Sequence, residues 1–200
     1  MSSSGATSTS PSRPLATILA EAMSRSQGFA AYLATDAEKG AKWQAIYDRV
    51  HLTSDQERLV KSFVREINVL VVSGIWCGDC VQQGPLLARI AEVNDCINLR
   101  WIDRDLVPEL MSHVSINAGA RVPVAIFMAE DGAVVSVFGD RSLTRYRAIA
   151  ARTIGPHCQV PGAPVDQDEL EATLQDWLNE FERVHLLLRL SGRLREKYRD

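Results

Sequence analysis

The chain has 200 residues, of which 46% are hydrophobic and 24% are charged, a composition typical of a globular protein. A chain of this length can bury a hydrophobic core without disulfide bonds, and it suits one domain with added elements. The formal net charge of −3 at pH 7 argues against a nucleic-acid-binding protein, because such proteins usually carry a basic excess. The four cysteines are too few for a secreted domain held together by disulfides.

The N-terminal residues 1–14 are rich in serine and threonine and contain no apolar segment, which a secretory signal would need. We therefore expect a disordered tail rather than an export signal. No stretch approaches about 18 consecutive apolar residues, so we expect no membrane span. The expected location is the cytoplasm, where a close pair of cysteines is more often catalytic or metal-binding than structural.

Helical spacing of apolar residues predicts that residues 15–67 form a helical N-terminal extension. The segments with this spacing are 15–23, 29–33 and 43–50. A further helix is predicted to be capped by Ser54, with Glu57 completing a capping box three residues later, and to continue toward Ile67.

The pattern changes at residues 68–154, which predict an α/β domain. The continuous apolar run over 69–72 predicts a strand buried on both faces, and the spacing over 81–93 predicts a helix. The elements predicted after these are a strand at 97–102, a helix at 108–113, a strand at 122–128 with an antiparallel partner at 134–138, and a helix at 145–154.

The last part of the chain is predicted to be a loop at 155–166, rich in glycine and proline, and a C-terminal helix within 167–200. One apolar stripe follows this helix: Leu170, Leu174, Trp177, Phe181, Val184 and Leu188. The stripe is expected to pack on the domain's own core, although a homodimer interface would produce the same pattern. The order of elements predicts an α/β fold with a central mixed sheet of about four strands, flanked by helices and extended by helices at both ends.

The two cysteines of the segment Trp76-Cys77-Gly78-Asp79-Cys80 lie at the predicted strand-to-helix junction. At a helix N-terminus, unpaired N–H groups and the helix dipole stabilise a negative charge, so the pKa of the first thiol should fall. The second cysteine, one turn further along, is placed to close a small disulfide ring.

A zinc site is the main chemical alternative for this pair, and zinc usually takes four ligands. The spare candidates are Cys96, Cys158, His113 and His157, and none of them recurs at paired spacing. We therefore expect neither a metal nor an organic cofactor.

The motif at residues 76–80, after a buried strand and with Val122-Pro123 downstream before a hairpin, resembles the thioredoxin superfamily. Within it, Trp-Cys-Gly-Asp-Cys resembles a bacterial thioredoxin-like group with a helical N-terminal region and an aspartate in the motif. The resemblance covers about residues 55–140, including Asp-Arg-Asp after the second strand and the segment 119–123.

The resemblance implies that Cys77 is the attacking thiolate and Cys80 the resolving thiol. It also implies a cis bond before Pro123, which would place the backbone of Val122 beside the sulfurs, and a glycine at Gly139 that leaves room for a partner. The residues expected to contact substrate are Trp76, Gly78, Asp79, Val122, Pro123 and Gly139.

Two positions depart from the family pattern. Val71 stands where the family usually has a buried aspartate in the strand, and Asp79 stands where ordinary thioredoxins have proline. The charge of Asp79 should oppose thiolate formation next to it. Asp103 or Asp105 is the alternative source of a carboxylate, at a strand end, although capping or solvated roles are the simpler interpretation.

Other polar residues have simpler expected roles. Cys96 is expected to be a free, partly buried thiol, and Cys158 a thiol in a loop; a regulatory role for Cys158 or its pairing with Cys96 is the alternative. Arginines 141, 145 and 147 are expected to form a solvated helix face, with binding of an anion as the alternative.

The predicted function is therefore thiol–disulfide exchange on protein or small-molecule disulfides, with electrons from a reductase or a small thiol and no nucleic-acid or membrane partner. The alternatives are a thioredoxin-like binding module with little turnover and a metal-binding CxxC protein. Burial of the Cys77 sulfur by residues 15–50 or 167–190 would favour the binding module.

Overall fold

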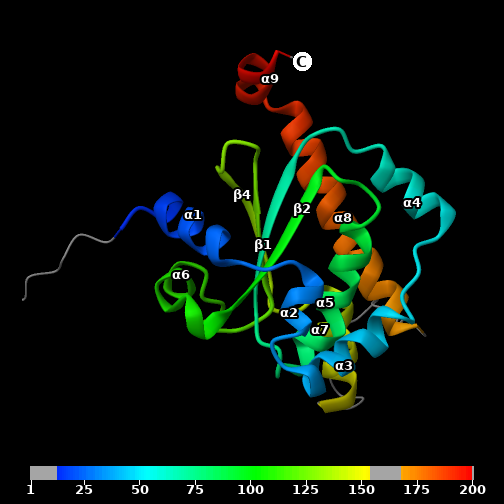
Figure 1. The fold of residues 1–200 in the computed structure, drawn as a ribbon. Coiled ribbons are helices and arrows are strands. Elements are labelled where there is room, and N and C mark those ends of the chain that lie inside the picture. Colours follow the sequence, from blue (N-terminus) through cyan, green and yellow to red (C-terminus); the bar gives the residue numbers. More distant parts are fainter. Residues whose placement is uncertain (1–12, 154–167, 200) are drawn as a thin grey trace, which may run out of the picture.

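The computed structural model describes residues 13–153 and 168–199, and these form a four-stranded sheet covered by helices on both faces (Figure 1). The strands are β1 (Ile67–Ser73), β2 (Ile97–Asp103), β3 (Val124–Met128) and β4 (Val134–Gly139). Their order across the sheet is β2-β1-β3-β4, with β1 parallel to β2 and antiparallel to β3, and β4 antiparallel to β3. The prediction of a mixed sheet of about four strands is confirmed.

The central strand β1 carries the apolar run Val69–Leu70–Val71–Val72, and all four side chains are fully buried. A strand with both neighbours paired and both faces covered needs apolar residues at successive positions rather than at alternate ones. The run therefore places β1 inside the sheet, and the segment with the two cysteines follows the C-terminal end of this strand.

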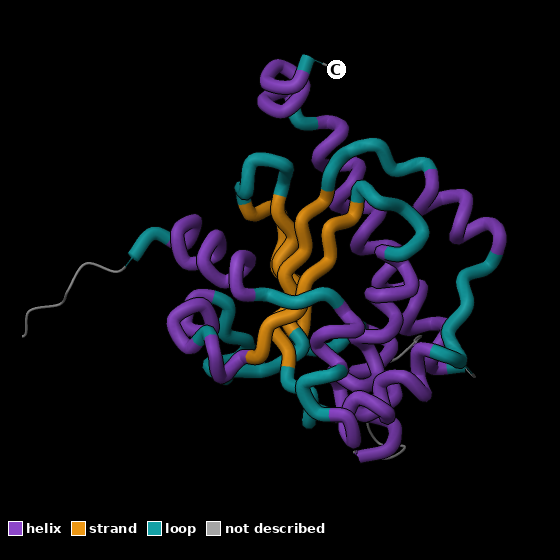
Figure 2. Tube along the Cα trace, viewed as in Figure 1, coloured by secondary structure: helices purple, strands orange, loops and turns teal. Residues whose placement is uncertain are grey.

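Helices cover the two faces of the sheet in separate groups. Helices α5 (Gly78–Ala91) and α8 (Glu169–Leu190) pack against each other on one face, and α1 (Leu15–Arg25) and α6 (Pro108–His113) pack against each other on the other (Figures 1 and 2). The apolar stripe of α8 faces the sheet. Its Trp177 meets Phe138 edge-on at 4.8 Å between ring centres, and its Phe181 meets Phe127 in the same way at 5.1 Å.

The C-terminal segment contains two helices rather than the single one predicted. Helix α8 ends at Leu190, and α9 (Gly192–Tyr198) begins after Ser191, whose side chain accepts a hydrogen bond from the backbone N–H of Leu194. A serine between two helical segments caps the second one, because its side-chain oxygen satisfies a free N–H group there.

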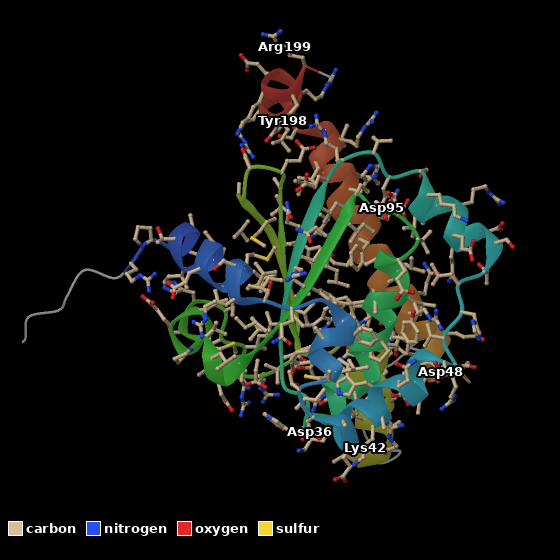
Figure 3. The ribbon with its side chains drawn as sticks, in the orientation of Figure 1. Asp36, Lys42, Asp48, Asp95, Tyr198 and Arg199 are labelled. Atoms are coloured by element: carbon tan, nitrogen blue, oxygen red, sulfur yellow. The ribbon has the colours of Figure 1, made fainter. Side chains whose placement is uncertain are left out.

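The N-terminal helices also include α2 (Phe29–Leu33), α3 (Ala37–Tyr47) and α4 (Ser54–Lys61). Helix α3 begins after Asp36, whose carboxylate accepts from the backbone of Lys39, and ends just before Asp48; Figure 3 labels both aspartates. The stretch before β1 is tied to the outer edge of β2 by two backbone hydrogen bonds of 2.8 Å between Gln27 and Trp101.

The predicted start and end of the fourth helix are corrected by the structure. The capping box uses Thr53 and Gln56, one residue before the predicted pair of Ser54 and Glu57. Both pairs match the capping-box pattern, but Thr53 is the residue with extended backbone, and the cap residue must be non-helical. The helix ends at Lys61, and Ile67 is the first residue of β1.

The remaining elements are a short 3-10 helix η1 (Arg104–Leu106) after β2 and α7 (Leu143–Thr153) after β4. The predicted loop at 155–166 lies outside the described residues, as does nearly all of the tail predicted at 1–14. In the part of the chain that the structure describes, no helix has the length and apolar character needed to cross a membrane.

Candidate active site

The two motif cysteines lie where β1 passes into α5. Cys77 is the residue that immediately precedes the helix, with extended backbone (φ −80°, ψ 123°), and it is half-buried. Cys80 lies in the first turn and is fully buried. Both thiols are free, and the Cys80 thiol hydrogen-bonds to the Cys77 sulfur. One sulfur is thus accessible and the other lies directly behind it.

The electrostatic environment of Cys77 favours its thiolate. The hydrogen bond from Cys80 is the largest cause, and backbone N–H groups of Cys80 and Asp79 add to it, so that the pKa of Cys77 falls to about 6. Burial and the charge of Asp79 act in the opposite direction and are outweighed. Backbone N–H groups without partners are what the first turn of a helix offers to an anion.

The surroundings of Cys80 have the opposite effect. Burial raises the pKa of the Cys80 thiol, and the hydrogen bond and charge of Cys77 raise it further. The hydroxyl of Ser73 and the backbone of Gly74 lower it by less. Cys80 is therefore a protonated donor as long as Cys77 carries the negative charge.

The segment before β3 lies next to the sulfur atom of Cys77. The protonated Cys77 thiol donates to the carbonyl oxygen of Val122 across 3.6 Å, and the Val122–Pro123 peptide bond is cis. Gly139 lies beside this bond with a φ of 157°, and a Cβ atom there would come within 2.3 Å of the Pro123 carbonyl oxygen. Gly139 is thus needed for the close approach of β4's end to the protein's own backbone.

Trp76 precedes Cys77 in the chain, and 47% of its surface is exposed. The guanidinium of Arg104 lies 4.5 Å from the centre of its ring, and Arg104 also donates to the carbonyl of Ala120 across 2.9 Å. A cation held over an indole face is attracted by the ring's electrons, so Arg104 fixes the ring in this orientation.

Asp79, inside the motif, points toward α7 instead of into solvent. Its carboxylate pairs with Arg141 across 2.6 Å and with Arg145 across 3.0 Å, and these partners lower its pKa despite partial burial. Arg145 is buried and also pairs with Glu169 of α8. The prediction that these arginines form a solvated helix face is therefore wrong for Arg141 and Arg145. The reason is that the first turn of α5 presents a carboxylate to them.

Two further residues, which the sequence analysis did not single out, support the motif from behind. Gln83 is fully buried, donates to the Asp140 carbonyl across 3.0 Å and accepts from the Ser142 backbone across 3.1 Å. Trp43 of α3 is fully buried and donates to the carbonyl of Ile75 across 3.0 Å. Neither residue stands out in the sequence, because both act through contacts between distant segments.

The other candidates lie apart from the sulfurs or in ordinary roles. Cys96 is a free, half-buried thiol, and Asp103 caps η1 by accepting from the backbone of Asp105. Gly78 has open space where a side chain would be. His157 and Cys158 lie outside the described residues. Across residues 13–153 and 168–199, no group of three or more histidine, cysteine or acidic side chains is arranged to hold a metal ion.

Two solved structures share the fold. One is a protein of unknown function from Pseudomonas aeruginosa, 20% identical, with a TM-score of 0.65, covering 82% of this chain and 97% of its own. The other is an HIV epitope scaffold, 19% identical, with a TM-score of 0.63 and the same coverage of 82% and 97%. No curated protein shows significant sequence similarity to the chain.

The match to a family model extends beyond the motif itself. The model described as Thioredoxin matches residues 26–151, which include β1, the cysteine pair, the Val122–Pro123 segment and the helices α2 to α4. With the sheet order and the position of the cysteines at the start of α5, this match places the protein: the chain belongs to the thioredoxin family.

Proposed function

We propose that the protein is a thiol–disulfide oxidoreductase in which Cys77 attacks and Cys80 resolves. The observation that carries this proposal is the pairing of a half-buried Cys77, whose pKa is lowered to about 6, with a fully buried Cys80 that hydrogen-bonds to it. A thiolate is the nucleophile in disulfide exchange, so this asymmetry supports the proposed roles of the two cysteines.

The exchange proceeds in two steps. The Cys77 thiolate attacks one sulfur of a substrate disulfide, a mixed disulfide forms, and the other half of the substrate leaves as a thiolate. The Cys80 thiolate then attacks the Cys77 sulfur, which releases the second half of the substrate. Two electrons pass from the cysteine pair to the substrate, and a reductase or a small thiol returns them.

The substrate would lie across Trp76 and the segment Val122–Pro123. The backbone of Val122 is within 3.6 Å of the Cys77 sulfur, so an extended chain bound there would bring its disulfide to the nucleophile. The exposed face of Trp76 offers an apolar contact beside it. We propose protein or peptide disulfides as substrates and the cytoplasm as the compartment.

We also propose that the protein represents the thioredoxin-like group with a Trp-Cys-Gly-Asp-Cys motif and a helical N-terminal extension. Helices α1 to α4 precede β1, and α2 and α3 lie next to the cysteine pair without covering Cys77 completely. The domain division proposed is an extension at 15–67, a thioredoxin-like domain at 68–154 and a C-terminal segment at 167–200.

The reduction of insulin by dithiothreitol, followed as turbidity, tests the proposed activity. We expect the wild type to accelerate the reaction and Cys77→Ser to abolish the acceleration. Cys96→Ser is the matched control, because it removes a thiol that lies outside the motif. Equal rates with the wild type, with Cys77→Ser and without protein would contradict the proposal and favour a binding module.

A further inference from the structure

Two arginine side chains meet beside the segment that contacts the Cys77 sulfur. Arg121 immediately precedes Val122 in this segment, and Arg141 follows the end of β4. The Nη1 atoms of Arg121 and Arg141 lie 3.2 Å and 3.8 Å from the same oxygen of Asp140, Oδ2. The two guanidinium groups are therefore neighbours, and we call them the arginine pair.

The positive and negative groups of this cluster differ in exposure. The side chain of Arg121 is 41% exposed and that of Arg141 is 24% exposed, whereas the Asp140 side chain that both approach is 5% exposed. The side chain of Asp79, which Arg141 contacts across 2.6 Å, is 17% exposed. Because the carboxylates are the more buried groups, the surface beside Val122 presents mainly the positive charges.

Both members of the arginine pair keep N–H donors for a further partner. Arg121 donates to Asp140 through Nη1, and its Nε and Nη2 have no hydrogen-bond partner among the described residues. Arg141 directs Nε and Nη2 to Asp79, and its Nη1 is too far from Asp140 for a hydrogen bond. The other oxygen of Asp140 accepts from the Tyr146 hydroxyl. An additional carboxylate would therefore find free donors on two adjacent guanidinium groups.

A third arginine near the site adds little to this positive charge. The guanidinium of Arg104 lies over the ring of Trp76 and pairs with Asp105 across 3.3 Å. Asp105 is exposed, and Asp103 next to Arg104 is half-exposed. The charge of Arg104 is thus balanced at the surface itself, so the excess of positive charge belongs to the arginine pair.

We propose that the arginine pair selects substrates that carry a carboxylate beside the disulfide, a role that rests on the proposed exchange reaction. The substrate class is a peptide or protein disulfide with aspartate or glutamate next to the cysteine that Cys77 attacks. An extended chain bound at Val122 would bring a flanking side chain to Arg121, because Arg121 is the next residue of the same segment. The carboxylate stays ionised and takes no part in the exchange of sulfur bonds, so the arginine pair determines specificity.

Three peptide disulfides of equal length test this selectivity in the wild type, with glutamate, glutamine or lysine next to the cysteine. Reduced protein is mixed with each peptide at low ionic strength, and the released peptide thiol is measured by acid quenching and chromatography. Each rate is divided by the rate with dithiothreitol, which corrects for the intrinsic reactivity of the peptide. We expect the glutamate peptide to react faster than the glutamine peptide by about fivefold, as for an exposed ion pair, and the lysine peptide to be slowest. Salt at about 0.5 M should reduce the difference by screening.

Replacing one arginine should change the ratio of the glutamate rate to the glutamine rate. In Arg121→Gln we expect the ratio to fall close to one, and in Arg121→Lys we expect part of it to return, because the charge is kept. The matched control is Arg58→Gln, which removes an exposed arginine of α4 that pairs with Asp55 and should keep the wild-type ratio. All proteins carry Cys96→Ser and Cys158→Ser, so that only the motif thiols react.

The selectivity would be overturned by equal corrected rates for the glutamate and glutamine peptides in the wild type, or by a ratio that is unchanged in Arg121→Gln. The comparison of peptides in the wild type needs no variant, so it decides the question even if Arg121→Gln folds poorly. A wild type that releases thiol from none of the three peptides would overturn the exchange reaction itself, which is a different result.

Discussion

The reactivity of Cys77 depends on hydrogen bonds to a single sulfur atom. The Cys80 thiol makes the largest of them, and the N–H groups at the start of α5 make the others. The sulfur is half-buried, so the substrate reaches it while the hydrogen bonds remain. Its nucleophilicity at neutral pH is therefore a property of the first turn of α5.

This environment predicts the pH dependence of alkylation. Only the thiolate reacts, so the rate of iodoacetamide labelling at Cys77 should rise with pH through about 6 and level off above it, rather than near the usual cysteine pKa of about 8.5. Cys80→Ala removes the main hydrogen bond, so the midpoint should move to higher pH. Labelling is measured by mass spectrometry with Cys96 and Cys158 replaced by serine. A midpoint that stays in place in Cys80→Ala would contradict this account.

The effect of Asp79 on the Cys77 thiol is hard to predict from the sequence. Its charge lies two residues from Cys77 in the chain and does raise the pKa of that thiol, as the sequence indicates. The arginines that neutralise it are 62 and 66 residues away. A pairing over that distance leaves no local pattern, so the sequence shows the charge without its partners.

Replacing Asp79 should therefore change stability more than reactivity. In Asp79→Asn the buried Arg145 loses one of its two carboxylate partners, and we expect a loss of about 1–3 kcal/mol in the free energy of unfolding. The pKa of Cys77 should fall, because an opposing charge is removed. Urea denaturation measures the first effect. Asp55→Asn, which breaks an exposed pair with Arg58, is the control and should change stability little. Equal stability of both variants would refute the structural role.

At the scale of elements, the close packing of α3 against α5 requires a glycine at position 84. A Cβ atom on Gly84 would come within 2.0 Å of the ring of Trp43, which is fully buried and fixed by a hydrogen bond. Gly84→Ala should therefore lower the free energy of unfolding by about 1–3 kcal/mol, although alanine favours a helix more than glycine does.

The control for this prediction is Gly192→Ala at the start of α9, where nothing lies within 4 Å of the new atom. It should be neutral or slightly stabilising in the same urea titration. If Gly84→Ala proved as stable as Gly192→Ala, α3 would not be packed against α5 as described.

The elements themselves were largely predictable from apolar spacing, whereas their ends were not. The run at 69–72 predicts β1 because a strand covered on both faces is apolar throughout. The cap residue of α4 differs from the predicted one by one position because two overlapping capping boxes fit the sequence there. The break between α8 and α9 depends on Ser191, a residue type that also occurs inside helices.

At the scale of the whole molecule, the site is assembled from four separate parts of the chain. The cysteines come from the junction of β1 and α5, and Val122–Pro123 comes from the segment before β3. Arg141 and Arg145, which follow β4, pair with Asp79 of the motif. Helices α2 and α3 supply Tyr32 and Trp43. The first two parts carry recognisable local motifs and were predicted. The other two depend on tertiary contacts and were not.

The measurement that tests this account most directly is the intact mass of the protein after brief exposure to a small peptide disulfide, with Cys96 and Cys158 replaced by serine. We predict that Cys80→Ser retains half of the peptide on Cys77. The wild type should retain none and form the Cys77–Cys80 disulfide, and Cys77→Ser should retain none because its buried thiol is protonated. An adduct on Cys80 in Cys77→Ser, or none on Cys77 in Cys80→Ser, would contradict the account.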